Sequence, residues 1–343
     1  MLKVLLTSIG GLVAPDIINT LRKDANQKIY IVGIDAKRDA IGFKFVDKFF
    51  TVPLGTQKNY IPSIKKIIKN EKIDIVVPFA DEEVIALSKN KDKLEFLGTK
   101  ILCNDYETTL KTINKGNLLT FLSKKEFPTP RFFLPKTKNE VKVYAKNLGY
   151  PKTSFVIKPA LGRGGRGFTV VSQKTNFFQE RDRYKVRLDR ILEELKLLRL
   201  MPDILMMEYL RGNEYSVDVL ADKGKVIYAI PRKRIETTFG PSLKGEFNSN
   251  QTVIEIIKKI VKIFQLDLIS NIQLKYRDVN NSSYPYITEI NPRPGGTIAL
   301  NSRVGVPLLL YGIKLVLDKP FPRNKKIKPI RFWRFYQEYY EKI

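Results

Sequence analysis

The sequence predicts an α/β and α+β protein, in which an N-terminal Rossmann-like domain precedes a longer α+β part. Over residues 1–105, short apolar runs alternate with segments of helical apolar period, which is the order of parallel βαβ units. Farther along the chain, strand-like runs follow one another with glycine or polar turns between them, as in antiparallel sheets. The 343 residues, 43% of them hydrophobic, supply enough apolar material for a large core.

The N-terminal elements are predicted from hydrophobic period and from turn residues. Apolar side chains recur at helical spacing after a Gly10-Gly11 turn. The turn lacks a complete G-x-G-x-x-G, and an acidic residue such as Asp35 ends the second strand of many such sheets, so dinucleotide binding is not favoured. We expect strands at 2–7, 29–35, 74–79 and 99–103, and helices at 13–23, at 60–70 and before the fourth strand.

The second part is predicted to begin with a helix at 106–125, which a proline-rich extended link follows. Further helices are expected at 138–148, 176–200, 252–265 and from about 299. Strands are expected at 154–160, 168–172, 203–210, 214–222, 226–235, 271–279 and 286–296. Aromatic residues of the tail recur at helical spacing, and we expect them to pack on the core or at a dimer contact: Phe332, Phe335, Tyr336, Tyr339 and Tyr340.

The composition excludes several classes of site. Histidine is absent, which excludes His-dependent triads and His-ligated zinc. Any metal must be held by oxygen, which favours Mg²⁺ or Mn²⁺. The single cysteine, Cys103, cannot form an internal disulfide; we expect it in the core of a cytoplasmic protein. No apolar run approaches the ~20 residues of a membrane span, and the N-terminal run lacks the basic region of a signal peptide.

The net charge is strongly positive, because 61 basic residues face 35 acidic ones and give +26. Such an excess suits either a polyanionic partner or a lysine-rich solvated surface. The lysine pairs are scattered along the chain, and no nucleic-acid-binding motif is recognisable. We therefore expect a solvated surface and no nucleic-acid partner.

A glycine-dense tip joins two predicted strands of a hairpin and contains Gly162, Gly164, Gly165 and Gly167. Glycine lets backbone N–H groups approach an anion closely. Arg163 and Arg166 add cationic donors, and Lys158 lies upstream on the strand, where it would point toward the same anion. The loop is not a Walker A loop, because no Gly-Lys-Ser/Thr follows. Its residues alone fit a phosphate-binding lid and an ordinary hairpin tip equally well.

Polar side chains alternate near the end of the last two predicted strands. Glu289 and Asn291 are two residues apart and therefore face the same side, and Gln273 lies opposite them if the two strands pair. One carboxylate with amide oxygens is a sensible site for a hard cation, completed by phosphate oxygens. Arg293 continues this face with a positive charge for an anion. Hydrogen-bonded polar residues at a strand end would show the same alternation.

The two sets of residues together resemble the ATP-grasp superfamily. The motifs are Lys115, FVIKPALGRGGRG, MMEYLRGNEYSVD, SNIQL and ITEINPRPGG, in the order and approximate spacing of that family. They look like those of the ATP-binding halves of the carbamoyl-phosphate synthase large chain and of stand-alone carboxylate–amine ligases. The resemblance implies a pre-ATP-grasp domain followed by a two-lobed ATP-grasp fold. It places the pre-ATP-grasp domain at 1–107, a linker helix and lid subdomain at 108–208, and a C-terminal subdomain at 209–343.

The resemblance also implies roles for individual residues. The residues that look like phosphate-holding cations are Lys115 and Lys158. The residues from Gly162 to Gly167 look like the mobile lid over the triphosphate. The segment Glu208, Tyr209 and Leu210 looks like the hinge that pairs with adenine, and Glu214 looks like the acceptor of a ribose hydroxyl. Those that look like magnesium ligands are Gln273, Glu289 and Asn291, and Arg293 looks like the residue that steadies the γ-phosphate or acyl phosphate.

The function that the resemblance implies is an ATP- and Mg²⁺-dependent ligase that joins a small carboxylate to an amine through an acyl phosphate. Gln273 stands where many ATP-grasp ligases have Asp or Glu, which lowers the negative charge of the site. This difference leaves open whether a second metal ion is bound. Two alternatives remain: carbamoyl-phosphate-type synthesis from bicarbonate and ammonia, and a non-catalytic ATP-binding regulator. A homodimer is the usual expectation.

Three further residues have two interpretations each. Arg232 and Arg234 could bind a substrate carboxylate or phosphate, since guanidinium forks suit such groups, or could lie on a basic surface turn. Asp81 ends the third predicted strand and could recognise an amine substrate; the favoured interpretation is an acid at a helix N-terminus.

Overall fold

The fold is described from a computed structural model, which covers residues 1–25, 28–162, 167–174, 185–237, 242–281, 284–335 and 337–342. The chain divides into two compact units. Unit 1 comprises Met1–Leu110, Tyr215–Ile272 and Asn291–Ile343, and unit 2 comprises Lys111–Glu214 and Gln273–Ile290. The borders after 107 and 208 stay a prediction.

The N-terminal sheet is parallel in every described pairing and has the order β3-β2-β1-β4-β5. Its strands are β1 (Leu2–Leu6), β2 (Ile29–Asp35), β3 (Lys48–Thr51), β4 (Ile75–Val77) and β5 (Lys100–Ile101). The helical segments around it are α1 (Ala14–Asp24), the 3₁₀ helix η1 (Ile41–Phe45), α2 (Tyr60–Glu71), α3 (Asp81–Lys89) and α4 (Lys91–Glu95). This order, in which strands are added on both sides of β1, confirms the predicted Rossmann-like domain.

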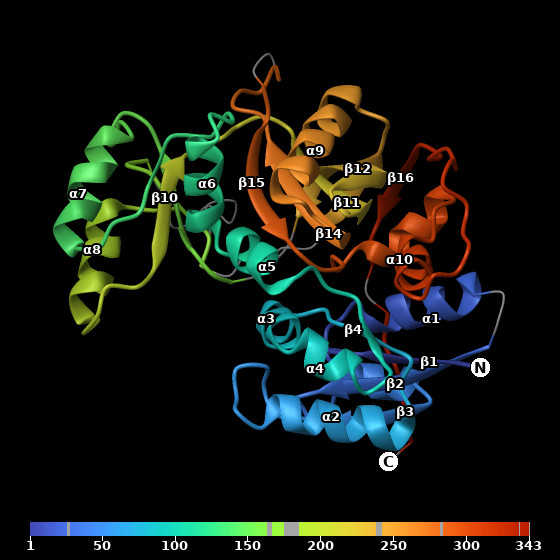
Figure 1. The fold of residues 1–343 in the computed structure, drawn as a ribbon. Helices are drawn as coiled ribbons and strands as arrows, with labels where there is room; N and C mark the ends of the chain where they lie inside the picture. Colours follow the sequence, from blue (N-terminus) through green and yellow to red (C-terminus); the bar gives the residue numbers. More distant parts are fainter. Residues whose placement is uncertain are drawn as a thin grey trace. The chain divides into compact units, whose positions relative to one another are not determined.

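Helices cover both faces of this sheet (Figure 1). Val4 and Leu6 of β1 pack with α1 in one core cluster, whereas Leu5 packs with α2 and α3 in another. The alternation along one strand follows from the two-residue period of β-structure. Cys103 is fully buried in the second cluster, as predicted.

The middle sheet has the order β6-β10-β7-β8-β9. Its strands are β6 (Phe132–Phe133), β7 (Phe155–Pro159), β8 (Thr169–Val171), β9 (Lys185–Val186) and β10 (Ile204–Glu208). The helices of this region are α5 (Tyr106–Ile113), α6 (Lys115–Lys124), α7 (Lys138–Asn147) and α8 (Leu188–Leu197). The predicted single helix over 106–125 is wrong, because the Asn114 side chain accepts a hydrogen bond from the N–H of Asn117 and begins a new helix.

The third sheet has the order β15-β14-β11-β12-β13-β16. Its strands are β11 (Glu214–Asp222), β12 (Lys225–Thr237), β13 (Ser242–Phe247), β14 (Leu268–Lys275), β15 (Tyr286–Asn291) and β16 (Ile330–Trp333). The helical segments that go with it are α9 (Gln251–Phe264), the 3₁₀ helix η3 (Ile298–Val304) and α10 (Leu308–Val316).

The tail differs from its helical expectation. Residues 330–333 form β16, which pairs antiparallel with β13. Phe332 is buried, whereas Trp333, Phe335, Tyr339 and Tyr340 are exposed. The apolar side chains of Ile330 and Phe332 alternate with Arg331, and this two-residue period determined the local structure. Tyr336 lies outside the described residues.

Within the described ranges, no single helix is long and apolar enough to cross a membrane. The pair η3 and α10, which is bent by 106°, reaches that length and composition only when both segments are taken together. Most side chains of this pair are buried in the core of unit 1.

Candidate functional site

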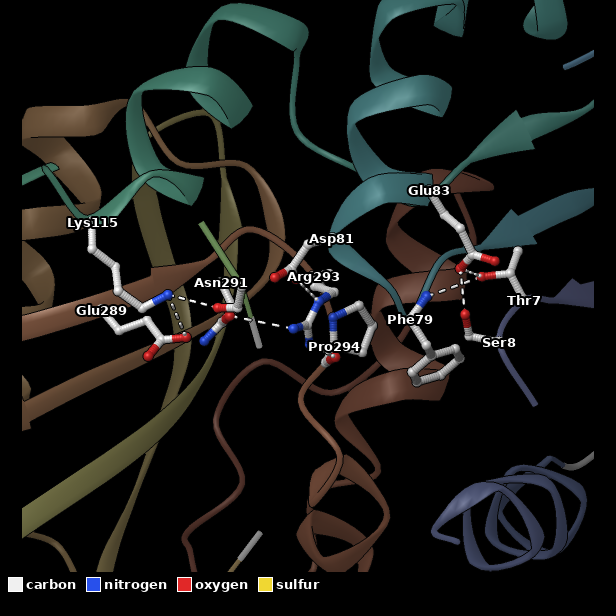
Figure 2. Close-up of polar contacts among 11 residues, drawn as sticks. Thr7, Ser8, Phe79, Asp81, Glu83, Lys115, Glu289, Asn291, Arg293 and Pro294 are labelled. Carbon is white, nitrogen blue, oxygen red and sulfur yellow. Dashed lines mark hydrogen bonds and ion pairs between the residues drawn. The ribbon is translucent and has the colours of Figure 1, made fainter. Parts of the chain in front are cut away.

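Two buried lysines and one carboxylate come together in unit 2. Lys115 is the first residue of α6, and its Nζ lies 3.8 Å from Oε1 of Glu289 on β15 (Figure 2). The same ammonium donates to the carbonyl oxygen of Gly162 at 2.7 Å. Lys158 on β7 donates to the carbonyl oxygen of Thr288 at 3.2 Å. The structure thus unites Lys115, Lys158 and Glu289, which are far apart in the sequence.

The electrostatics of this cluster leave positive charge in excess. Lys115 is 6% exposed and Lys158 9% exposed. The charges that act on Lys158 are those of Lys115 and Lys275 on one side and those of Glu289 and Glu214 on the other. The pKa of Lys158 is lowered to about 8, chiefly by burial; Glu289 and Glu214 oppose this shift, and Lys115 and Lys275 add to it. Three ammonium groups against two carboxylates, with two of the lysines buried, favour a bound anion with several charges, such as a polyphosphate.

The depressed pKa of Lys158 predicts a pH-dependent stability. Because this pKa falls from 10.5 to about 8 on folding, the unfolded chain binds more protons between pH 8 and 10.5, and stability rises with pH across that window. We expect Lys158→Met to raise the free energy of unfolding near pH 7 in the nucleotide-free, EDTA-treated protein. The gain should shrink between pH 8 and 10.5.

Urea unfolding of both proteins at a series of pH values measures this difference. Lys258→Met is the matched control, since the Lys258 side chain is 55% exposed. A gain that stays constant from pH 8 to 10.5 would contradict the burial of a charged Lys158.

The predicted adenine and ribose residues lie around the turn between β10 and β11. Glu208 ends β10 and accepts from the backbone N–H of Arg131 at 2.8 Å, and Leu210 is buried. Two cations, one on β14 and one in the segment after it, were not predicted from the sequence. Lys275 lies 3.7 Å from Glu214 and 5.9 Å from the ring centroid of Tyr209.

The second missed cation is Arg277, whose guanidinium lies 3.1 Å from Glu208 and 5.0 Å from the ring centroid of Tyr286. A signal for both cations was present in the sequence. Gln273, Lys275 and Arg277 are spaced two apart, as side chains on one face of a strand are.

The predicted metal ligands stand on the two neighbouring strands β14 and β15. Gln273 lies on β14, and Glu289 and Asn291 lie on β15. No group of three or more His, Cys, Asp or Glu side chains in the described ranges could hold a metal ion. One carboxylate and neutral amide oxygens fit Mg²⁺ that arrives with nucleotide phosphates better than they fit a bare ion, because Mg²⁺ needs six oxygen ligands.

In unit 1, Arg293 is anchored on three sides. Its Nε donates to Oδ1 of Asp81 at 2.6 Å, and its terminal nitrogens donate to the carbonyl oxygen of Pro294 at 3.2 Å and to Oδ1 of Asn291 at 3.3 Å (Figure 2). Asp81 is the first residue of α3, so the predicted helix N-terminus is confirmed. Its ion pair with Arg293 spans 212 residues of sequence, and no local pattern could have shown it.

The first turn of the N-terminal sheet uses its polar groups internally. Asp35 accepts from the N–H of Gly10 at 2.6 Å, and a Cβ at position 10 would lie 2.8 Å from that carboxylate. The carboxylate that would hold a ribose in a dinucleotide site therefore holds the turn itself. Glu83 accepts from the hydroxyl groups of Thr7 and Ser8, the second at 2.9 Å (Figure 2).

Only part of the predicted lid falls within the described residues. Gly162 and Gly167 both have left-handed backbone angles, with φ of +134° and +71°, which glycine adopts most readily. A Cβ at Gly167 would lie 2.7 Å from the ring of Pro159. Gly164 and Gly165 lie outside the described residues.

Residues 200–335 match the family model described as "ATP-grasp in the biosynthetic pathway with Ter operon", and residues 4–102 match that of the "PylC-like, N-terminal domain". The chain therefore carries an ATP-grasp domain and a PylC-like N-terminal domain, and the predicted superfamily is confirmed.

Curated relatives include the carbamoyl phosphate synthase large chains of Clostridium acetobutylicum and Pyrococcus furiosus. The first is 25% identical over 87% of this chain and the second 23% identical over 88%. The matched regions span only 26% and 28% of those relatives' own lengths, so this chain corresponds to about a quarter of each.

Solved structures share the fold. N5-carboxyaminoimidazole synthetase from Staphylococcus aureus, solved with ADP, superposes with a TM-score of 0.70 at 14% identity and covers 96% of this chain and 80% of its own. Biotin carboxylase from Campylobacter jejuni, solved with a β,γ-ATP ligand, gives a TM-score of 0.66 at 19% identity, covering 94% and 71%. These likenesses confirm the predicted two-lobed ATP-grasp fold.

Proposed function

We propose that this protein is an ATP- and Mg²⁺-dependent ligase that joins a small carboxylate to an amine through an acyl phosphate. The observation that carries the proposal is the cluster of Lys115, Lys158 and Glu289, in which two buried ammonium groups lie near one partly exposed carboxylate. A nucleotide triphosphate supplies the missing negative charge. The names of the relatives and neighbours, which are synthases, synthetases and carboxylases, support the same class of reaction.

In the proposed reaction a carboxylate oxygen of the acid attacks the γ-phosphorus, and ADP leaves. The amine nitrogen then attacks the acyl carbon, and inorganic phosphate leaves as the amide forms. Lys115 and Lys158 hold the phosphates, and Glu208, Tyr209, Leu210 and Glu214 hold the nucleoside. Gln273, Glu289 and Asn291 would hold Mg²⁺, which would supply positive charge to offset that of the transferred phosphoryl group.

Positioning and electrostatics are sufficient for this chemistry, so no protein nucleophile is needed. A reaction without a protein nucleophile agrees with a chain that has no histidine. Arg293, whose guanidinium is anchored within unit 1, has the role in this proposal of steadying the γ-phosphate or the acyl phosphate. The predicted role of Gly162 and Gly167, which is to cover the phosphates and keep water from the acyl phosphate, belongs to this proposal.

A second candidate is carbamoyl-phosphate-type synthesis from bicarbonate and ammonia, which the match to the carbamoyl phosphate synthase large chains favours. The proposal includes a homodimer, since a biotin carboxylase domain among the similar structures is a dimer. It also includes a cytoplasmic location.

The test is ADP release over a panel of carboxylates, bicarbonate included, each with a panel of amines and ammonia. We expect one acid–amine pair to saturate, and Lys158→Ala to weaken ATP binding by about 1.5–3 kcal/mol, as for a hydrogen bond to a charged group. Titration calorimetry measures that affinity. ATP binding without turnover on any pair would favour a non-catalytic regulator, and unchanged ATP affinity of Lys158→Ala would contradict the nucleotide site.

A further inference from the structure

Three arginines lie on one face of the third sheet, entirely within unit 1. Arg232 and Arg234 are two residues apart on β12, and Arg234 is paired with Gly245 of β13. Gly245 is paired on its other side with Phe332 of β16. Cross-strand partners share a face of a sheet, so these residues point the same way. We call Arg232, Arg234 and Arg334 the arginine face.

Arg334 joins this face because the strand pairing continues one residue beyond β16. Its backbone N–H donates to the carbonyl oxygen of Leu243 at 2.7 Å, and it lies two residues after Phe332. Gly245, between the flanking strands, carries no side chain. A Cβ there would lie 2.7 Å from the Phe332 ring and 2.9 Å from a backbone oxygen, so glycine lets the strands and the ring pack closely.

The guanidinium groups of the arginine face act on one another, and one buried donor among them lacks a partner within the described residues. Arg232 is 2% exposed, and it pairs with the buried carboxylate of Asp218 at 3.1 Å and with Ser216 at 2.9 Å. Its Nε has no hydrogen-bond partner among the described residues. Burial lowers the pKa of Arg334, and Arg232 lowers it further, whereas Asp16 opposes the shift.

Burial likewise lowers the pKa of Arg232, and Arg234 adds to that effect while Asp218 opposes it. Desolvated guanidinium groups that repel one another are a costly arrangement, and a bound anion would relieve it.

The arginine face borders the loop that carries Arg293. A terminal nitrogen of Arg334 donates to the carbonyl oxygen of Gly296 at 3.2 Å. Gly296 follows Arg293 by three residues, so their Cα atoms are at most about 11 Å apart. Gly295, between them, lets the loop lie close to Asp218, since a Cβ there would lie 3.2 Å from its carboxylate oxygen. An anion at Arg334 is thus a short distance from the proposed reacting end of the substrate.

We propose that the arginine face binds a second anionic group, a carboxylate or a phosphoryl group, of the acid whose other carboxylate reacts near Arg293. The substrate class is therefore a compact dianionic acid. This inference rests on the proposed function, and guanidinium forks are suited to both groups. Arg334, at the edge of the arginine face, contacts the anion directly, and the buried Arg232 adds positive charge without contacting it.

Calorimetry with three probes of similar length tests the inference: butyrate with one anion, succinate with two carboxylates, and 3-phosphonopropionate with a carboxylate and a phosphonate. The protein is saturated with ADP and Mg²⁺, so that the probes do not occupy the nucleotide site. We expect at least one dianion to bind tenfold or more tightly than butyrate. The better dianion identifies the second group.

Arg334→Gln should remove that advantage, and Arg334→Lys should keep part of it. Arg331→Gln is the matched control, because Arg331 is on the same strand but on the opposite face, 3.3 Å from Glu246. Equal affinity for butyrate and both dianions, or equal effects of Arg331→Gln and Arg334→Gln, would overturn the inference.

The two proposals fail separately. If dianion binding depends on Arg334 but the protein never releases ADP, the proposed ligase activity is contradicted and the proposed anion site is supported. If Arg334→Gln and the unchanged protein turn over a monocarboxylate at the same rate, the proposed anion site is contradicted and the proposed ligase activity is supported.

Discussion

Glu289→Gln is expected to abolish turnover while leaving the fold intact. Glu289 is the only carboxylate in the predicted metal set with Gln273 and Asn291, and so the only protein anion there that offsets Mg²⁺. The amide of Gln presents one oxygen acceptor, and its NH₂ group has the wrong polarity toward a cation. We expect kcat to fall more than about 100-fold, beyond the usual cost of losing an outer-shell partner of a metal site.

The structure also indicates which parameter this substitution should change. Glu289 lies 3.8 Å from the buried ammonium of Lys115 and offsets the charge of Lys158. Without its carboxylate, the two lysines have less counter-charge in the free protein. ATP binding should therefore be retained in Glu289→Gln, because the phosphates meet more positive charge, and the loss should lie in kcat.

Glu246→Gln provides the matched control. Glu246 lies on β13 of the same sheet, in an exposed ion pair with Arg331, and its change should leave ADP release unaltered. Asn291→Ala should lower turnover less than Glu289→Gln, since a water molecule can partly replace one neutral oxygen on Mg²⁺. Near-normal ADP release by Glu289→Gln at saturating Mg²⁺ would show that the metal is held elsewhere.

The N-terminal domain could be predicted because its strands and helices differ in period. Apolar residues at helical spacing indicate α1. β1, β2 and β4 are largely apolar, with Lys3 in β1 and Asp35 at the end of β2 as the charged residues, as is typical of buried parallel strands. The edge strand β3 (Lys48–Thr51) was missed, because it is short, begins with a charge and is buried little. Such strands give a weak apolar signal.

The third sheet was predicted less completely, for a physical reason. β13 (Ser242–Phe247) contains Gly245 and Lys244 and has low intrinsic strand propensity. It forms because β12 and β16 pair with it on either side. β16 in turn lies about 85 residues of sequence from its partner, as the Glu246–Arg331 pair shows, and no local pattern encodes that pairing.

The candidate site divides in the same way. Lys158, Glu289 and Arg293 could be proposed from motifs, since each lies in a compact run of characteristic residues. Their partners could not, because the Asp81–Arg293 pair depends on tertiary folding. Arg232 had two interpretations in the sequence, and the structure excludes the exposed turn, since the residue is 2% exposed.

Asp218→Ala is expected to lower the free energy of unfolding by about 3–5 kcal/mol, the usual cost of leaving one partner of a buried ion pair uncompensated. Asp218 is fully buried. It accepts from Arg232 at 3.1 Å, from Asn271 at 2.7 Å and from Asn301 at 3.1 Å. Removing it leaves the Arg232 guanidinium buried without its carboxylate partner, and the amides of Asn271 and Asn301 each lose an acceptor. Urea unfolding of the nucleotide-free protein measures the loss.

The control is Glu255→Ala, which removes an exposed carboxylate 2.7 Å from Lys258 and should cost less than about 1 kcal/mol. A paired variant separates the charge from the packing: Asp218→Leu with Arg232→Met fills similar volume without ions. It should recover most of the stability that Asp218→Ala loses, because replacing a whole buried pair by apolar groups is often neutral. If Asp218→Ala costs no more than Glu255→Ala, Arg232 is not a charged, desolvated group. The positive charge that the arginine face requires would then be missing as well.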